Sequence, residues 1–136
     1  MKTSKLTLKQ LRAFLPRIAF NNLIGLKLTR LHADGVTVEC SVRPDLLNSA
    51  GVLHGGVAAT LADAAVGIAL NRHFGGLRPV TTVELKINYF RPVSAGKMYA
   101  RAYLMRIGST ISVGRVDLTD GEHNLVGTAL ATYMAK

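Results

Sequence analysis

The residues most able to do chemistry lie between Asn48 and Leu70, in the stretch NSAGVLHGGVAATLADAAVGIAL. A polar loop passes through His54-Gly55-Gly56 and leads into a predicted helix of very small residues, whose one charged side chain is Asp63. A carboxylate in such surroundings is costly unless it is paired or hydrogen-bonded. We therefore predict a general base or nucleophile in an enclosed site. A solvated helix face or a structural hydrogen bond is the alternative.

The start of this helix is a second chemical feature. Gly55 and Gly56 would present unpaired backbone N–H groups at the positive end of the helix dipole. Because glycine lets a substrate oxygen approach closely, the pair favours an oxyanion hole, although a simple turn also explains two glycines. His54 directly before the pair and Asn48 six residues earlier make the pattern more specific.

The spacing of these two features suggests a site shared between subunits. Gly55 and Asp63 are eight positions apart, which is about 12 Å along a helix axis. An oxyanion donor and a base that act on one carbonyl group must both lie near the reacting atoms. If both act in one reaction, they belong to different copies of the chain across a two-fold interface.

A helix over residues 55–71 would have two distinct faces. One face is predicted to pack on the sheet of its own chain and comprises Val57, Leu61, Ala64 and Ile68. The other is small and polar, is predicted to face a neighbouring chain, and comprises Gly56, Thr60, Asp63 and Gly67.

The rest of the chain is predicted to be mainly β-strand. Alternating apolar and polar residues indicate strands over 26–31, 36–43, 80–90, 98–107, 110–118 and 125–134, with a bulge at Gly114. A short amphipathic helix over 6–15 has Thr7 as its N-cap and Pro16 at its end. Tight turns between consecutive strands predict an antiparallel sheet. The expected organisation is one α+β domain over 1–136, with 1–24 as a helical extension packed on it.

Two strands bear on the site. In the strand over 80–90, Val83, Leu85, Ile87 and Tyr89 share one predicted face, and Thr82, Glu84, Lys86 and Asn88 the other. In the strand over 36–43, Cys40 falls on the apolar face, which predicts a buried structural thiol rather than a nucleophile.

Composition narrows the class of protein. The chain has 136 residues, 49% of them hydrophobic, a net charge of +9 and one cysteine, so a reducing, cytoplasmic location is expected. The basic residues are scattered, which is typical of a solvated surface or of a site for a phosphate-bearing ligand. We expect no nucleic-acid partner and no membrane partner, since the basic helix over 6–15 is weak evidence for one. His32, His54, His73 and His123 are scattered, so no metal site is expected.

The pattern N-x-x-G-x-x-H-G-G, followed by an acid nine residues after the histidine, resembles the hotdog-fold acyl-CoA thioesterases. It is formed by Asn48, Gly51, His54, Gly55, Gly56 and Asp63. The PaaI-type branch, named for phenylacetate degradation and including the human thioesterase-superfamily-member type, is the most similar. The resemblance covers residues 30–134 and implies a six-stranded antiparallel sheet wrapped around a long central helix. It also implies a homodimer joined edge to edge, often a dimer of dimers, with each site built from both chains.

The resemblance further implies hydrolysis of an acyl-CoA or aryl-CoA thioester to the free acid and CoA, with no cofactor because CoA is part of the substrate. Gly55 would polarise the thioester carbonyl with help from Asn48, and His54 would support the loop. Asp63 of the partner would activate water or attack directly. Thr82 would hold that water, unless a one-residue slip makes Thr81 the relevant hydroxyl.

Further substrate contacts are expected on the same basis. Gly56 and Thr81 would also contact the substrate, and the CoA phosphates or adenine would meet basic residues. The basic candidates for that contact are Arg91, Arg106 and Arg115. Ser109 is a further candidate, because the turn from Arg106 to Ser109 resembles the phosphate- or adenine-side loop of the family. The acyl group itself is left open.

Two alternatives remain within the same fold. One is a hydratase or dehydratase, whose usual His-Phe-Pro or Asp-to-His helix signatures are missing. The other is a non-catalytic acyl-CoA-binding protein. Such regulators commonly carry a DNA-binding segment, for which residues 1–25 are too short.

Overall fold

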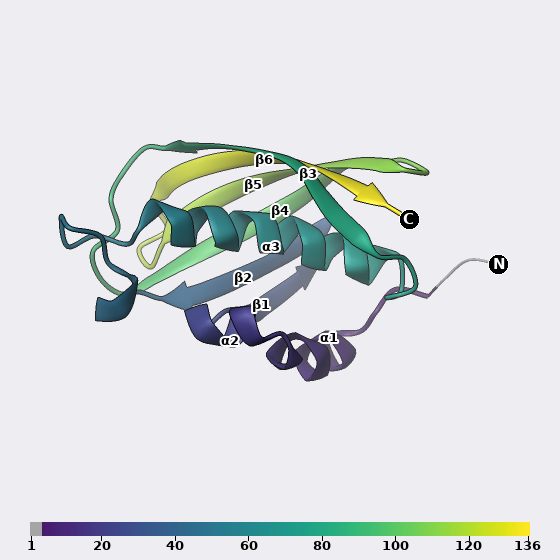
Figure 1. The fold of residues 1–136 in the computed structure, drawn as a ribbon, viewed down its shortest axis with the longest axis horizontal. Helices are drawn as coiled ribbons and strands as arrows, with labels where there is room; N and C mark the ends of the chain where they lie inside the picture. The colour runs from purple at the N-terminus through teal and green to yellow at the C-terminus, as the bar shows by residue number, and fades with distance from the viewer. Residues whose placement is uncertain (1–3) are drawn as a thin grey trace.

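A computed structural model describes residues 4–136 and contains one long helix, α3, lying along a curved antiparallel sheet (Figure 1). The elements in chain order are α1 (Leu8–Phe14), the 3-10 turn η1 (Leu15–Arg17), α2 (Ala19–Ile24), β1 (Lys27–His32), β2 (Gly35–Ser41), the 3-10 turn η2 (Pro44–Leu46), α3 (Gly55–His73), β3 (Val80–Tyr89), β4 (Lys97–Ile107), β5 (Ile111–Asp120) and β6 (Leu125–Ala135). The predicted α+β class and hotdog architecture are confirmed. Helix α2 and the two 3-10 turns were not predicted.

The sheet has six strands in the order β1-β2-β4-β5-β6-β3, and every neighbouring pair is antiparallel. Because β3 crosses over to pair with β6, the strand that directly follows α3 in the chain forms one edge of the sheet. Helix α3 contacts β2, β3, β4, β5 and β6, so it occupies the middle of the core.

The face of α3 that packs on the sheet differs from the predicted one. Leu61 and Ile68 are buried as expected, whereas Val57 and Ala64 are only half-buried. The buried face consists of Ala58, Leu61, Ala62, Ala65, Val66, Ile68, Ala69 and Leu70. Its alanines therefore let the helix lie close to its own sheet. The four residues predicted to face a neighbouring chain are exposed or half-buried, namely Gly56, Thr60, Asp63 and Gly67.

Strand β5 runs without the bulge that was predicted at Gly114. Ser112, Gly114, Val116 and Leu118 alternate inward in one unbroken parity. The register shift lies on the neighbouring strand β4, between Leu104 and Arg106. Gly114 serves packing instead, because a Cβ there would stand 2.7 Å from a Val66 methyl group.

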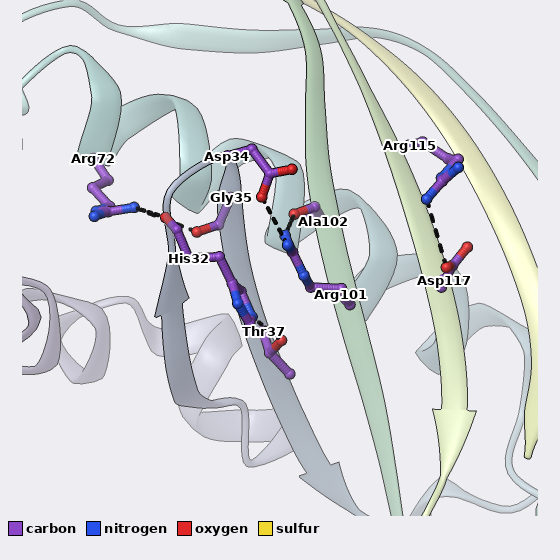
Figure 2. A network of polar contacts seen from close by, with 9 residues as sticks. All are labelled: His32, Asp34, Gly35, Thr37, Arg72, Arg101, Ala102, Arg115 and Asp117. Atoms are coloured by element: carbon purple, nitrogen blue, oxygen red, sulfur yellow. Dashed lines mark hydrogen bonds and ion pairs between the residues drawn. The ribbon is translucent and has the colours of Figure 1, made fainter. Parts of the chain in front are cut away.

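The C-terminal end of α3 is tied to the hairpin between β1 and β2. Arg72 donates to the backbone oxygens of His32 and Gly35, and Arg101 on β4 binds Asp34 at 2.7 Å in the same turn (Figure 2). The helix that carries Asp63 is thus fixed at its far end by the sheet it covers.

The N-terminal extension begins as predicted. Thr7 caps α1, and Gln10 completes a capping box with it. Helix α1 ends at Phe14, and Pro16 lies within η1. The predicted extension 1–24 therefore holds two short helices, and its first three residues fall outside the described range. Within residues 4–136, every helix is too short or too polar to cross a bilayer.

Candidate active site

The carboxylate of Asp63 accepts hydrogen bonds from two hydroxyl groups of its own sheet. Thr82 Oγ1 on β3 donates to Asp63 Oδ1 at 2.8 Å, and Tyr133 Oη on β6 lies 2.7 Å from the same oxygen. Among the residues the structure describes, Oδ2 has no hydrogen-bond partner. A structural hydrogen bond thus occupies one carboxylate oxygen and leaves the other to accept a proton or attack a carbonyl carbon.

A β-bulge at Val83 aims Thr82 at the helix. Thr82 pairs with Tyr133 and Glu84 with Thr132, so Val83 is the extra residue, and its side chain is 59% exposed. The bulge reverses the inward parity, which places Thr82 on the inner face with Leu85 rather than on the opposite face as predicted. Thr81 is exposed, whereas Thr82 is the hydroxyl that donates to Asp63 of the same chain.

Tyr133 is the residue of this site that the sequence did not reveal. Its hydroxyl also lies 2.6 Å from the backbone oxygen of Asp63, and burial, reinforced by the Asp63 carboxylate, raises its pKa well above the ordinary value. The phenol therefore stays protonated and remains a donor. Gly67 makes room for it, since a Cβ there would stand 3.1 Å from Tyr133 Oη. The available signal was a tyrosine at an inward position of β6 beside Ala129 and Ala131.

The loop before α3 is held by its own polar groups. Asn48 Oδ1 accepts from the N–H groups of Ala50 and Val52 at 2.9 Å and 3.2 Å. His54 is the N-cap of α3, and its Nδ1 accepts from the Gly56 N–H at 2.8 Å. The Nδ1 atom of the ring therefore acts as the acceptor that caps the helix.

This cap leaves one of the two glycine donors free. The Gly56 N–H is occupied by His54, so Gly56 does not offer the substrate donor that was expected of it. The Gly55 N–H has no acceptor within residues 4–136, and its carbonyl accepts from the Tyr89 hydroxyl. Gly55 is therefore the donor that can reach a carbonyl oxygen.

A pocket of about 340 Å³ opens at this donor. Asn48, Gly55 and Arg91 line it together with Tyr89 and Phe90. Its apolar wall is formed by Val52, Leu53, Ala58, Val93, Met98, Leu118 and Val126. The structure thus brings Arg91 to the same pocket as Asn48 and Gly55, whereas Asp63, Thr82 and Tyr133 are absent from the pocket lining of the same chain.

The other expected CoA contacts lie elsewhere in the chain. Met98 lines the pocket at one end of β4, and Arg106 is eight residues further on, about 27 Å away along a strand. Ser109 lies in the turn between β4 and β5, where its backbone oxygen accepts a hydrogen bond from Arg78 at 2.7 Å. Arg115 on β5 stacks on the Tyr103 ring at 4.4 Å. Arg106, Ser109 and Arg115 are therefore not neighbours of Gly55 in one chain.

Cys40 takes no part in this chemistry. Its side chain is 1% exposed, as predicted, and burial raises the pKa of the thiol to about 11. Within residues 4–136, no three His, Cys, Asp or Glu side chains gather in a way that could hold a metal ion.

Comparison with known proteins identifies the family. Residues 50–127 match the family described as the thioesterase superfamily. The medium/long-chain acyl-CoA thioesterase YigI of Escherichia coli is 29% identical over 136 residues, which cover 89% of this chain and 88% of that protein.

Solved structures agree with this assignment. The thioesterase HI1161 from Haemophilus influenzae superposes with a TM-score of 0.90 at 26% identity, covering 100% of this chain and 95% of its own. A mutant of the phenylacetic acid degradation protein PaaI from Thermus thermophilus reaches a TM-score of 0.76 at 31% identity, covering 85% and 96%. The helix with its lone carboxylate, the capped loop and these matches lead to one conclusion: the chain belongs to the thioesterase superfamily, in its PaaI-type branch, and is a thioester hydrolase.

Proposed function

We propose that the protein hydrolyses acyl-CoA thioesters at sites composed of two copies of the chain. The observation that carries this proposal is the separation of the two halves of the chemistry. The free Gly55 donor opens into the pocket, whereas Asp63 lies further along the same helix and outside the pocket lining. A second copy of the chain, related by a two-fold axis, would bring its own Asp63 to the Gly55 pocket of the first.

The edge strand β3 supports such a pairing. It spans Val80–Tyr89, pairs only with β6, and leaves its other edge without a partner strand among the described residues. A long unpaired edge is a template for another strand. Val83, Tyr89 and Phe90 are 59%, 53% and 55% exposed beside it. We propose a homodimer joined along β3, with a dimer of dimers as its further assembly.

In the proposed mechanism, the backbone N–H of Gly55 and the side-chain NH₂ group of Asn48, both of one chain, donate hydrogen bonds to the thioester oxygen. A water molecule then bonds to the carbonyl carbon while its proton passes to Asp63 Oδ2 of the other chain. The C–S bond breaks, the CoA thiolate takes up a proton, and the free acid leaves. In the alternative route, Oδ2 itself bonds to the carbonyl carbon, the C–S bond breaks, and the CoA thiolate takes up a proton from solvent. Water later attacks the Asp63 carboxyl carbon of the mixed anhydride, which releases the free acid and restores the carboxylate. Thr82 and Tyr133 hold Oδ1 in either route, so Thr82 binds the carboxylate directly.

The substrate proposal rests on the apolar pocket wall and on the relatives. YigI is named for medium- and long-chain acyl-CoA, and PaaI for phenylacetic acid degradation. We propose medium- and long-chain acyl-CoA as the first substrates to test and aryl-CoA as the second arm. Arg91 at the pocket mouth is the proposed contact for CoA phosphate. The cytosol is the proposed location, where a lone cysteine stays reduced.

Release of free thiol from each acyl-CoA tests the activity. Replacing Asp63→Asn is expected to lower kcat at least about a hundredfold, because general base catalysis is lost, with circular dichroism and sedimentation unchanged. Unchanged turnover in this variant would remove Asp63 from the mechanism. Absence of turnover by the wild type on every thioester would favour the binding protein instead. After a single turnover in oxygen-18-labelled water, label in Asp63 identifies the nucleophilic route with water attacking the Asp63 carboxyl carbon, since general base catalysis places the label in the free acid alone.

Subunit complementation tests the shared site. Gly55→Pro removes the N–H at the first helical position, where proline is tolerated. Gly55→Ala is the matched control, because both variants place an atom near Tyr89 but only the alanine keeps the donor. Chains with Asp63→Asn, unfolded and refolded together with Gly55→Pro chains, are expected to regain about a quarter of wild-type activity through heterodimers with one intact site. No recovery despite heterodimer formation would contradict a shared site.

A further inference from the structure

The N-terminal segment turns apolar side chains outward, and the proposed active site leaves them unexplained. Phe14, Ile18, Phe20 and Leu23 are 48%, 37%, 52% and 66% exposed, within ten residues of chain. Leu11, Leu15 and Ile24 of the same segment are at most 5% exposed, so the segment already has a buried inner face. The exposed group is a second apolar face that faces solvent.

Helix α2 shows this most clearly, because its polarity is reversed. Asn21 is 8% exposed, while Phe20 and Leu23, one turn apart, point to solvent. A surface helix ordinarily buries its phenylalanine and leucine and exposes its asparagine. The orientation is fixed at both ends, since Asn22 Nδ2 donates to the Pro16 carbonyl and Gly25 ends the helix with φ 72°. The apolar side is therefore a built surface and not a frayed end.

The charge around this face is mainly positive. The first acidic residue of the chain is Asp34. The segment before it holds Lys2, Lys5, Lys9, Arg12, Arg17, Lys27 and Arg30. Lys9, Arg12 and Arg17 are exposed among the apolar residues. The nearest acids, Asp45 and Glu39, are each paired with a base, Arg43 and Lys97, so the excess charge beside the apolar residues is positive. A protruding apolar group with an excess of cations around it is complementary to a surface that is apolar inside and negative outside.

We propose that this surface, the N-terminal docking face of Phe14, Ile18, Phe20, Leu23, Lys9 and Arg17, binds the headgroup region of an anionic lipid membrane. The apolar side chains enter the boundary between headgroups and acyl chains, and the cations bind anionic headgroups. A second copy of the chain is a poor occupant, because a self-contact would oppose cations of like charge in a protein of net charge +9. This proposal differs from the sequence analysis, which expected no membrane partner. That analysis predicted the helix over 6–15 but did not predict α2.

The docking face is linked to the oxyanion loop by one arginine. Arg43 Nη2 donates to the Leu23 carbonyl at 2.7 Å, and its Nε binds Asp45 in η2 at 3.1 Å. The last residue of η2, Leu46, accepts from the His54 N–H at 2.8 Å. A docked α2 would hold this loop near the bilayer surface.

Vesicle co-sedimentation tests the proposal independently of catalysis. The purified protein is mixed with phosphatidylcholine vesicles that contain either no charged lipid or about 30% phosphatidylglycerol, at low and high salt. Binding is expected only to the anionic vesicles, with loss at high salt. The double variant Phe20→Ser/Leu23→Ser is expected to weaken binding about tenfold or more, because two inserted side chains are lost. Lys9→Gln/Arg17→Gln is expected to weaken it several-fold.

Leu77→Ser is the matched control, since Leu77 is 74% exposed but lies outside the docking face. It is expected to bind vesicles as the wild type does. All variants should hydrolyse a soluble short-chain acyl-CoA at the wild-type rate. Equal binding to neutral and anionic vesicles, no binding to either, or equal loss in the Leu77 variant would overturn the proposal. So would a change in the sedimentation coefficient of Phe20→Ser/Leu23→Ser, which would assign the face to a second copy. Retention on immobilised polyglutamate without vesicle binding would assign it to an acidic protein.

Discussion

The hydroxyl of Tyr133 lies 2.7 Å from Asp63 Oδ1, although the two residues are 70 positions apart in the chain. The same hydroxyl reaches the backbone oxygen of Asp63, so β6 fixes both the carboxylate and the helical turn that carries it. Together with Thr82, this contact makes the two carboxylate oxygens inequivalent.

Removing the phenol hydroxyl should impair the chemical step more than substrate binding. We expect Tyr133→Phe to lower kcat about tenfold with little change in KM, because a hydrogen bond to a charged group is lost away from the pocket. Steady-state kinetics check this. Tyr103→Phe is the control, since Tyr103 lies on the outer face beneath Arg101 and Arg115. An equal loss in both variants would contradict the assignment.

The two adjacent threonines of β3 should differ sharply. Thr82→Val removes the donor to Asp63 Oδ1 with almost no change in shape, and we expect kcat to fall about tenfold. Thr81→Val changes an exposed side chain and should leave kcat and the melting temperature unchanged within error. Comparable losses of kcat at both positions would contradict the idea that the bulge at Val83 directs only the Thr82 hydroxyl toward Asp63.

The effect of a methyl group at position 67 on the free energy of unfolding should depend on whether Tyr133 keeps its hydroxyl. Alanine in place of glycine stabilises a helix interior by about 1 kcal/mol, but here the new Cβ would stand 3.1 Å from Tyr133 Oη. We expect Gly67→Ala to be neutral or destabilising in the wild type and stabilising by up to about 1 kcal/mol in Tyr133→Phe. Urea unfolding of the four proteins measures the coupling, and additive effects would show that the hydroxyl is not the obstacle.

The contribution of the buried Cys40 thiol to stability should depend on pH. Since the pKa is raised to about 11, the unfolded state releases the thiol proton first as the pH rises, so this contribution to stability is intact below about pH 8.5 and declines up to pH 11. At pH 8 the native thiol should react with a disulfide reagent at least about a hundredfold slower than in denaturant. Cys40→Ser should flatten the alkaline decline, and rapid native labelling would contradict the burial.

The sequence predicted the parts of the fold that depend on the local spacing of apolar residues. Six strands, the long helix and the turn chemistry follow from spacing, and Asn48, His54, Gly55 and Asp63 stand out by type. The buried face of α3 did not follow, because alanines such as Ala62 and Ala65 give no signal until a sheet lies against them.

The missing parts all depend on contacts distant in the chain. Thr82 was placed on the wrong face, since one extra residue at Val83 reverses parity and no residue type marks it. Tyr133 was missed because its partner lies 70 residues away. Helix α2 was missed because its outward face carries the residues that usually mark a core.

The occupied Oδ1 of Asp63 also has a stereochemical consequence. A free carboxylate has two interchangeable oxygens and can meet a planar carbonyl from many directions. With Oδ1 held by Thr82 and Tyr133, only Oδ2 remains, and this oxygen has one fixed position relative to the helix axis. In the proposed mechanism, every thioester would then present the same prochiral face of its carbonyl group, whatever acyl chain it carries.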